Sequence, residues 1–379
     1  MTPPLAGLRV LELGRLMAAP FCGQVLGDLG ADVIKVEQPG RGDESRAYGP
    51  PFVNGESYYY LSLNRAKRSI ALDLKDPKGA EALRRLVRTA DVFLHNWASD
   101  AIERIGFGEA AVKALNPRIV TCGISGFGKD DPRPALDMSA QAASGIASLT
   151  GPAGGEALRC GVPVSDLVAG LYAAVGILAA LQGRERTGKG TAVSTSLLEA
   201  SAALLTYQAS RYFVTGEVPP RRGNAHPSIV PYDGYRTSDG RVVLAVANDA
   251  TFLRLAAILG LPEDPRFATN PDRVRNRGAL EPLVATAVRG FATAALLARC
   301  REARVPCDEI LDLKGVFEAH PGLRETLVHP VTGPVQTLAS PLRIDGETPR
   351  QTPPPRLGED GARILREAGL SPAEIRDLL

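Results

Sequence analysis

The sequence predicts an α/β fold with a parallel sheet, followed by a smaller helical unit that carries a small sheet of its own. Short apolar runs alternate with amphipathic stretches over the first half of the chain, and strands that alternate with helices pair in parallel. At 379 residues the chain is long enough to bury a large core and to form two domains. Its 44% hydrophobic and 23% charged residues are typical of a soluble globular protein.

The elements of the first part follow from these runs. The predicted strands are residues 8–13, 33–36, 69–74, 90–94, 118–122 and 191–194. Helices are predicted over residues 20–29, 77–87 and 197–213. The second of these helices begins at Asp76-Pro77, because proline is well tolerated at the first helical position.

One carboxylate, Asp166, stands at the start of a long apolar helix. No side chain of residues 167–181 is charged, and the Tyr172 hydroxyl is the single polar group. The run is shorter than the roughly 20 apolar residues that span a bilayer, so we expect a helix buried in protein, with Gly170 and Gly176 allowing close neighbours. Asp166 is expected to cap this helix and to be kept ionised by the helix dipole. An ionised, positioned carboxylate can also act as a nucleophile.

The second part is predicted to be helical with a small sheet. Residues 215–231, rich in Gly, Pro and Arg, form a linker or a functional loop, and residues 234–247 form a hairpin around Ser238-Asp239-Gly240. Helices are predicted over 251–259, 275–289 and 294–303, strand-like pieces over 326–344, and two short helices at the C-terminus.

Charge, cysteine and histidine content exclude several classes. The formal net charge is +2, from 44 basic and 42 acidic residues, so no nucleic-acid or membrane partner is expected. Five cysteines without a CxxC pair argue against a disulfide framework. Four histidines lack metal-ligand spacing, so no metal is expected. The N-terminus has no signal-peptide pattern, and we expect a reduced, cytoplasmic protein.

Two further patterns leave alternatives open. Residues 11–23 run from a strand through small residues into a helix, a geometry that offers backbone N–H groups to an anion, but the segment lacks GxGxxG and dinucleotide binding is disfavoured. Basic residues cluster over 64–69, with Lys75 and Arg104 beyond them; they are either solvated surface or ligand contacts. Trp97 could border a purine or belong to the core.

Several segments carry a family resemblance. Residues 5–13, 29–37, 64–74, 126–128, 161–181, 188–190 and 357–359 resemble the class III CoA-transferases, also called the formyl-CoA transferase superfamily. Residues 49–60 and 225–232 look most like the succinyl-CoA-dependent dicarboxylate enzymes, including the succinate–hydroxymethylglutarate type. Arg15 and Met17 stand where formyl-CoA enzymes carry His and Gln, which argues against a formyl-CoA and oxalate pair.

The resemblance implies an architecture. It predicts a Rossmann-like large domain of residues 1–205 and 330–379 with a parallel sheet, and a smaller α+β domain of residues 225–325. Residues 206–224 and 326–329 would be linkers. Two chains would form an interlocked, ring-like homodimer with the active site between domains.

The resemblance also assigns roles. Asp166 would be the nucleophile that forms an aspartyl anhydride and an aspartyl-CoA thioester, with the CoA thioester as co-substrate and no tightly bound cofactor. Backbone N–H groups at Asp166 and at residues 225–226 would stabilise oxyanions. The implied CoA-binding residues are Gln38, Leu72, Lys75, Asn96, Trp97, Arg104 and Ile105. The implied substrate-binding residues are Arg15, Leu136 and His226.

Three alternatives accompany these roles. Arg15 could receive a second carboxylate in bidentate fashion, or it could contact a phosphate or have a structural role. An α-methylacyl-CoA racemase needs two positioned acid–base groups, and this chain has Leu136 where that branch has a His before Asp137. A non-catalytic acyl-CoA-binding protein would leave Asp166 unmodified.

Overall fold

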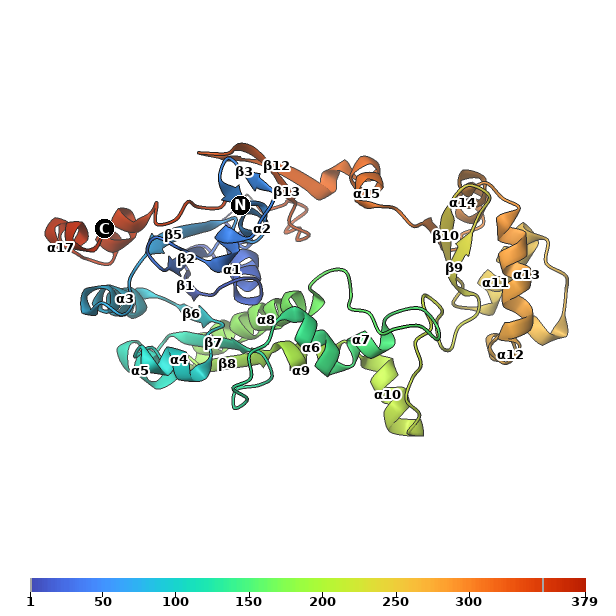
Figure 1. The fold of residues 1–379 in the computed structure, drawn as a ribbon, viewed down its shortest axis with the longest axis horizontal. Coiled ribbons are helices and arrows are strands. Elements are labelled where there is room, and N and C mark those ends of the chain that lie inside the picture. The colour runs from blue at the N-terminus through green and yellow to red at the C-terminus, as the bar shows by residue number, and fades with distance from the viewer. Residues whose placement is uncertain (1, 350) are drawn as a thin grey trace. The chain divides into compact units, whose positions relative to one another are not determined.

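The computed structural model describes residues 2–349 and 351–379, which form two compact units (Figure 1). The first unit contains the chain up to Ala147 together with Arg159–Val214 and Pro321–Leu379. The second contains Ser148–Leu158 and Thr215–His320. The domain limits that the resemblance implies remain a prediction.

The first unit is built on a parallel sheet of six strands. Every neighbouring pair in the sheet is parallel, which confirms the predicted α/β class. Numbered along the chain, the order is 3-2-1-4-5-6, the order of the Rossmann fold. The strands, across the sheet, are β5 (Lys67–Ala71), β2 (Asp32–Glu37), β1 (Arg9–Leu13), β6 (Val92–His95), β7 (Val120–Ser125) and β8 (Ala192–Ser196).

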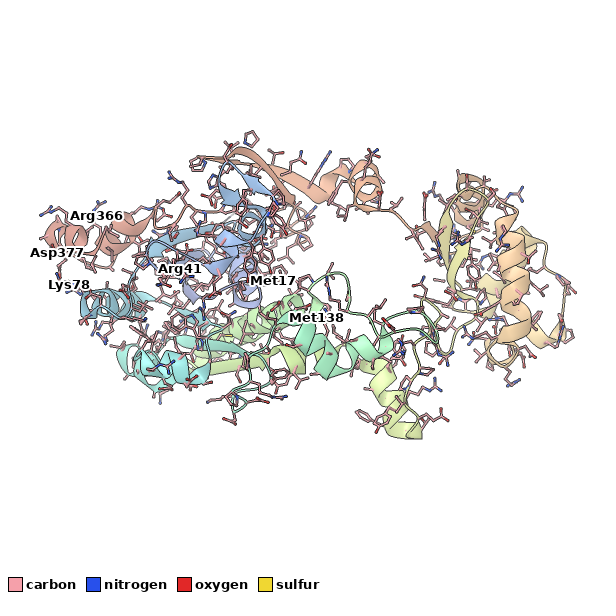
Figure 2. All side chains as sticks on the ribbon, viewed as in Figure 1. Met17, Arg41, Lys78, Met138, Arg366 and Asp377 are labelled. Carbon is pink, nitrogen blue, oxygen red and sulfur yellow. The ribbon has the colours of Figure 1, made fainter. Side chains whose placement is uncertain are left out.

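Successive strand residues point to opposite faces of the sheet, and helices cover both faces. Leu11, Ile34 and Phe93 belong to one core cluster, with apolar residues of the helices α3 (Pro77–Thr89), α5 (Glu109–Leu115) and α16 (Gly361–Glu367). The last helix, α17 (Pro372–Leu378), is tied to α3 by an ion pair of 3.1 Å between Lys78 and Asp377 (Figure 2).

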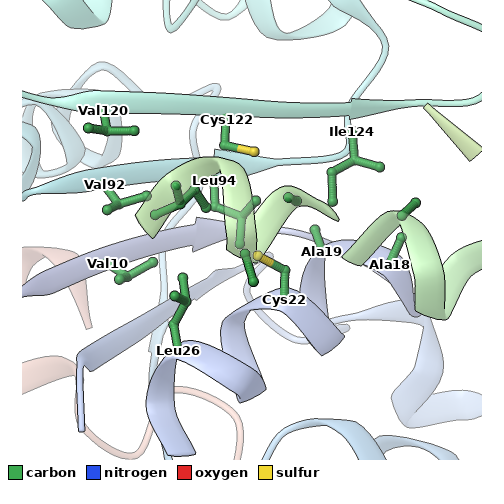
Figure 3. Close-up of a cluster of buried hydrophobic side chains, with 14 of the residues drawn as sticks. Val10, Ala18, Ala19, Cys22, Leu26, Val92, Leu94, Val120, Cys122 and Ile124 are labelled. Atoms are coloured by element: carbon green, nitrogen blue, oxygen red, sulfur yellow. The ribbon is translucent and has the colours of Figure 1, made fainter. Parts of the chain in front are cut away.

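The other face packs on α1 (Ala18–Asp28) and α8 (Val164–Thr187). Figure 3 shows Val10, Leu94 and Cys122 of the strands meeting Cys22 and Leu26 of α1. The alternation of Val10 with Leu11 along one strand thus divides the apolar residues between two cores, as a doubly covered parallel sheet requires.

The apolar helix α8 has 24 residues, and by length and hydropathy alone it could cross a membrane. The expectation that it is too short is therefore wrong, because the helix extends beyond the uncharged run. The expected close neighbours are confirmed: a Cβ on Gly170 would lie 2.7 Å from the Ala18 carbonyl oxygen, and one on Gly176 would lie 2.6 Å from Val193 Cγ1. These contacts pack α8 beside α1 and against β8, on the same face of the sheet.

The remaining elements of the first unit are shorter. The single helix predicted over 197–213 is two helices, because α9 ends at Ala203 and Thr206 has a φ of +39°. The small hairpins are β3 (Phe52–Val53) with β4 (Glu56–Ser57), and β12 (Arg324–His329) with β13 (Gly333–Leu338). The short helices are α2 (Tyr58–Leu63), α4 (Ser99–Arg104), α6 (Asp137–Ser144), α9 (Leu197–Ala203) and α10 (Thr206–Thr215), with α7 (Ile146–Leu149) at the boundary between the units.

The second unit has a small antiparallel sheet packed on helices, as predicted. Its strands are β11 (Cys307–Glu309), β10 (Arg241–Ala245) and β9 (Tyr232–Arg236), and the predicted hairpin joins β9 to β10. Arg273 is fully buried in this unit, pairs with Asp249 at 2.7 Å and donates to the Val230 carbonyl at 2.8 Å. The helices are α11 (Asp249–Leu259), α12 (Asn270–Arg275), α13 (Arg277–Arg289), α14 (Thr293–Glu302) and α15 (Leu313–Ala319).

Candidate active site

The strand order reverses between β1 and β6, and open α/β sheets bind ligands outside the carboxyl ends of their strands at such a point. Asn96 follows β6 and Arg15 follows β1. The Asn96 Oδ1 atom accepts the Arg15 N–H at 2.9 Å, and its Nδ2 donates to the Arg15 carbonyl at 2.8 Å. One side-chain amide therefore holds both backbone groups of Arg15.

A buried ion cluster contacts the loop that contains Arg15, between β1 and α1. Lys35 of β2 pairs with Glu12 and Asp43 at 2.8 Å each, and all three side chains are fully buried. Lys35 also donates to the Gly14 carbonyl at 2.9 Å, and Asp43 accepts the Leu16 N–H at 3.1 Å. Leu16 has a φ of +64°, which few non-glycine residues adopt. The cluster thus stabilises a strained turn between β1 and α1.

The charges of this cluster are set by its own members. Burial by itself would lower the pKa of Lys35, but the carboxylates of Glu12 and Asp43 outweigh it and raise that pKa. The second lysine, Lys67, pairs with Glu12 at 2.8 Å, and burial lowers its pKa to about 8. The cluster was not predicted from the sequence, although Glu12 and Lys35 each interrupt an apolar strand and so signal a buried charge.

A cavity of about 460 Å³ opens beside the loop; we call it the switch-point cavity. Arg15 also lines it, with its guanidinium 2.9 Å from Glu44 and 5.1 Å from the Trp97 ring centre. Arg104 is not among its lining residues and instead pairs on the surface with Asp100. The residues of the predicted CoA set that line this cavity are Gln38, Leu72, Lys75, Trp97 and Ile105.

A second cavity of about 300 Å³ contains Asp166; we call it the Asp166 cavity. Predicted residues Asn96 and Leu136 line it, and Tyr48 lines both cavities. Met17 and Met138, labelled in Figure 2, contribute apolar wall. The other lining residues include Leu16, Ala18, Tyr59, Asp137, Arg159 and Pro163.

Asp166 does not cap its helix, contrary to the expectation. It is the third residue of α8, and the N-cap position is Pro163. The Ser165 N–H is instead accepted by Asp137 Oδ1 at 2.9 Å, while Asp137 Oδ2 accepts from Gln141 Nε2 at 2.7 Å. Among the described residues, none forms a hydrogen bond or an ion pair with the Asp166 carboxylate.

The ionisation of Asp166 also differs from the expectation. Burial raises the pKa of Asp166 to about 7, and the negative charge of Asp137 adds to the shift. The helix dipole alone therefore does not keep the acid ionised. Tyr59 lies in the same cavity, where burial and the charge of Asp166 raise its pKa to about 12, so its hydroxyl is neutral. The sequence indicated no role for Tyr59, and Asp137 entered only through the racemase alternative.

His226, a predicted substrate-binding residue, belongs to the second unit. Its Nδ1 accepts the Ser228 N–H at 3.1 Å, and its carbonyl accepts from Arg277 at 2.5 Å. Burial, with a smaller effect of Arg277, lowers the pKa of His226. Across residues 2–349 and 351–379, no group of three His, Cys, Asp and Glu side chains is placed to hold a metal ion.

Comparisons with known proteins identify the family of the chain. A model of the family "CoA-transferase family III" matches residues 5–361. A succinate–glutarate CoA-transferase of Agrobacterium fabrum is 40% identical over 96% of both chains. The human succinyl-CoA:glutarate CoA-transferase is 38% identical over 96% of this chain and 86% of its own. The chain belongs to CoA-transferase family III and is an enzyme of that class, as its motifs predicted.

Solved structures carry the same fold. The crystal structure of a CAIB/BAIF family protein from Brucella suis has a TM-score of 0.85 and 38% identity, and the match covers 97% of this chain and all of that one. A Mycobacterium tuberculosis protein is 26% identical, with a TM-score of 0.83, over 95% of this chain and 98% of its own. The α/β fold is therefore shared over nearly the whole length.

Proposed function

We propose that this enzyme transfers CoA from succinyl-CoA to a dicarboxylic acid, with Asp166 as the nucleophile. The observation that carries the proposal is the Asp166 carboxylate, which lines a cavity and has no hydrogen-bond or ion-pair partner among the described residues. The names of the relatives support the substrates: the two glutarate enzymes are joined by a succinyl-CoA–D-citramalate CoA-transferase of Chloroflexus aurantiacus, 37% identical over 82% of this chain.

The proposed reaction exchanges one thioester for another without net proton uptake. A carboxylate oxygen of Asp166 attacks the thioester carbon and the C–S bond breaks. CoA thiolate departs, and a mixed succinyl–aspartyl anhydride is formed. The thiolate attacks the aspartyl carbon of that anhydride, which releases succinate and forms an aspartyl-CoA thioester. The acceptor carboxylate then displaces the thiolate to form a new anhydride. The thiolate attacks its acceptor acyl carbon and regenerates the Asp166 carboxylate.

CoA is proposed to lie along the switch-point cavity and to reach the Asp166 cavity past Tyr48. Leu72 is buried and Trp97 offers an aromatic face, so both suit the adenine. Lys75 lines the cavity and suits a phosphate. The proposed set is completed by Gln38, Asn96, Arg104 and Ile105. To bind CoA, Arg104 would have to break its surface ion pair with Asp100. No cofactor beyond the CoA thioester is proposed, because thioester exchange needs none.

The N-terminus of α1 is proposed to stabilise the oxyanions. Met17, its N-cap residue, provides no side-chain cap, the first turn holds no acid, and Ala18 lines the Asp166 cavity. In the proposed complex, the partial positive charge of this helix N-terminus would face the reacting carbonyl. The Asp166 backbone and the loop at residues 225–226 remain proposed as further donors, with His226 and Leu136 as substrate contacts.

We further propose a cytoplasmic, interlocked, ring-like homodimer with the domain limits that the resemblance implies. Exposed apolar side chains on a core helix support a partner chain: Leu171, Tyr172 and Val175 of α8 are 46%, 48% and 63% exposed. A dimer that buries them would remove a continuous apolar strip from water. Light scattering coupled to gel filtration tests the oligomeric state.

The decisive experiment pairs acyl-CoA donors with free acids and follows exchange by mass spectrometry. Succinyl-CoA and glutarate should give glutaryl-CoA and succinate in equal amounts. Hydroxylamine added during turnover should convert Asp166 to its hydroxamate, visible as a mass change on its peptide. Active enzyme without that modification would contradict the covalent mechanism, and succinyl-CoA that donates to no dicarboxylate would contradict the substrate assignment. A non-catalytic acyl-CoA-binding protein would show neither exchange nor modification.

One observation favours a racemase as the second candidate. Asp137 and Asp166 line the same cavity, and burial with the charge of Asp137 raises the pKa of Asp166 to about 7, which suits proton transfer. Both Asp137 oxygens, however, already accept hydrogen bonds. Deuterium incorporation from solvent at the α-carbon of a 2-methylacyl-CoA would establish the racemase instead.

A further inference from the structure

We propose that Arg159 binds the distal carboxylate of the dicarboxylic acyl group and so sets the preference for dicarboxylates. This inference rests on the proposed CoA transfer at Asp166 and names a subsite for its substrate. Arg159 lies on the segment that leads into α8 and lines the Asp166 cavity.

The charges around the Asp166 cavity require a cation. Among the described lining residues, Arg159 carries the only positive charge, and Asp137 and Asp166 are both acids. Asp137 is engaged by the Ser165 N–H and the Gln141 amide and cannot donate to a substrate anion. A second carboxylate that enters this cavity meets two acids and is repelled unless a cation pairs with it.

The guanidinium of Arg159 has donors to spare. Its Nη1 donates to the carbonyls of Cys160 and Gly161, at 3.0 and 3.5 Å. In the described chain no carboxylate lies within ion-pairing distance of Arg159, and its Nε and Nη2 make no hydrogen bond. These two atoms form the planar fork that matches a carboxylate in bidentate fashion. The two carbonyl contacts orient the fork without neutralising it.

Arg15, the arginine that the sequence favoured for this role, is placed differently. It lines the switch-point cavity and not the Asp166 cavity. Its guanidinium is already paired with Glu44 at 2.9 Å and lies over Trp97. Arg15 therefore suits the CoA side of the site, and Arg159 suits the acid side.

The charge balance along the reaction also favours a cation near Asp166. When the succinyl group is held as an anhydride, Asp166 has lost its charge and the distal carboxylate is the remaining anion of the acyl group. Arg159 would keep that anion paired through the intermediate. A butyryl group has the same chain length and a neutral end, so it cannot use the fork.

The test compares succinyl-CoA with butyryl-CoA on the same variants. The rate of hydroxylamine-trapped modification at Asp166 is measured for wild type, Arg159→Met, Arg159→Lys and Arg15→Met. We expect Arg159→Met to lower the rate with subsaturating succinyl-CoA by about 10- to 100-fold, the effect of one lost hydrogen-bonded charge. The butyryl-CoA rate should change by less than about 3-fold, and Arg159→Lys should recover part of the loss. Arg133→Met is the matched control, because Arg133 is an exposed arginine paired with Asp131 that lines neither cavity.

The experiment distinguishes a failure of the Arg159 assignment from a failure of the proposed Asp166 mechanism. Equal losses with both thioesters in Arg159→Met, or a loss selective for succinyl-CoA in Arg15→Met alone, would overturn the Arg159 assignment and leave Asp166 as nucleophile. Wild-type enzyme that exchanges CoA with no modification of Asp166 would overturn the proposed mechanism itself. A glutarate titration of the CoA-exchange rate gives a second readout, in which Arg159→Met should raise KM for glutarate.

Discussion

Asp137 Oδ1 accepts the backbone N–H of Ser165 at 2.9 Å, so the first turn of α8 is capped by a carboxylate from α6. This contact removes the capping role from Asp166, whose carboxylate faces the cavity instead. It also fixes a negative charge beside Asp166, which adds to the effect of burial on its pKa. Asp137 therefore caps the helix, and the Asp166 carboxylate is left unpaired for its proposed role as nucleophile.

The pH dependence of catalysis should follow the Asp166 carboxylate. Burial and Asp137 raise the pKa of Asp166 to about 7. Because the proposed nucleophile is the ionised carboxylate, kcat/KM should rise about tenfold per pH unit below pH 7 and level off above it. Asp137→Asn removes the neighbouring charge and should move this limb toward lower pH, by on the order of one unit. Asp131→Asn, which alters an exposed acid paired with Arg133, is the control and should leave the limb in place. A limb that stays put in Asp137→Asn would show that Asp137 does not act on the nucleophile.

The raised pKa of Asp166 should also make the stability of the fold depend on pH. A carboxyl group whose pKa is raised on folding binds protons more tightly in the folded state, so stability falls as pH rises from about 4 to about 7. Asp166→Asn removes this cost and should raise the free energy of unfolding at pH 8 by on the order of 1–3 kcal/mol. At pH 4 the gain should be much smaller, because the folded wild-type side chain is then already neutral. Urea unfolding of both proteins at the two pH values measures the difference, and equal gains at pH 4 and pH 8 would contradict the raised pKa.

The sequence predicted the parallel sheet because that information is local. The alternation of apolar residues along β1, β2 and β6 specifies two buried faces, and the intervening helices force parallel pairing. The break after α9 could not be predicted in the same way, because it depends on the positive φ of Thr206, a backbone conformation that a threonine in the sequence does not signal.

The sequence pointed to those candidate site residues that belong to recognisable sequence segments. The family resemblance implied Asp166 and the proposed CoA set, and five residues of that set line one cavity. The cap from Asp137 depends on a contact 28 residues away in sequence, and the raised pKa of Asp166 depends on burial. Arg159 drew no attention, because its placement on the Asp166 cavity is a property of the folded chain.

The buried ion cluster should be costly to disrupt. Lys35→Met leaves Asp43 without its cation and Glu12 with one lysine instead of two. Breaking a buried pair by removing one partner typically costs about 3–5 kcal/mol, and we expect that loss in urea unfolding. Lys78→Met is the matched control, because Lys78 and Asp377 form an exposed pair, with both side chains 63% exposed; its effect should stay below about 1 kcal/mol. Similar losses in the two variants would mean that the buried cluster does not stabilise the fold.

The Asn96 amide should contribute to acyl-CoA binding as well as to the stability of the fold. Asn96→Ala removes both hydrogen bonds to the Arg15 backbone, and the freed loop must be ordered again when ligand binds. We expect a loss of about 1–2 kcal/mol in unfolding free energy and a rise of roughly tenfold in KM for acyl-CoA, since 1.4 kcal/mol of ordering corresponds to that factor. Asn116→Ala is the control. The Asn116 amide donates to the carbonyls of Val87 and Ala90 and accepts the Arg118 N–H at 3.1 Å, and Asn116 lines neither cavity. Asn116→Ala should lose similar stability with KM unchanged. If both variants shift KM alike, the effect comes from general loosening of the sheet, and the Asn96–Arg15 contact has no specific part in binding.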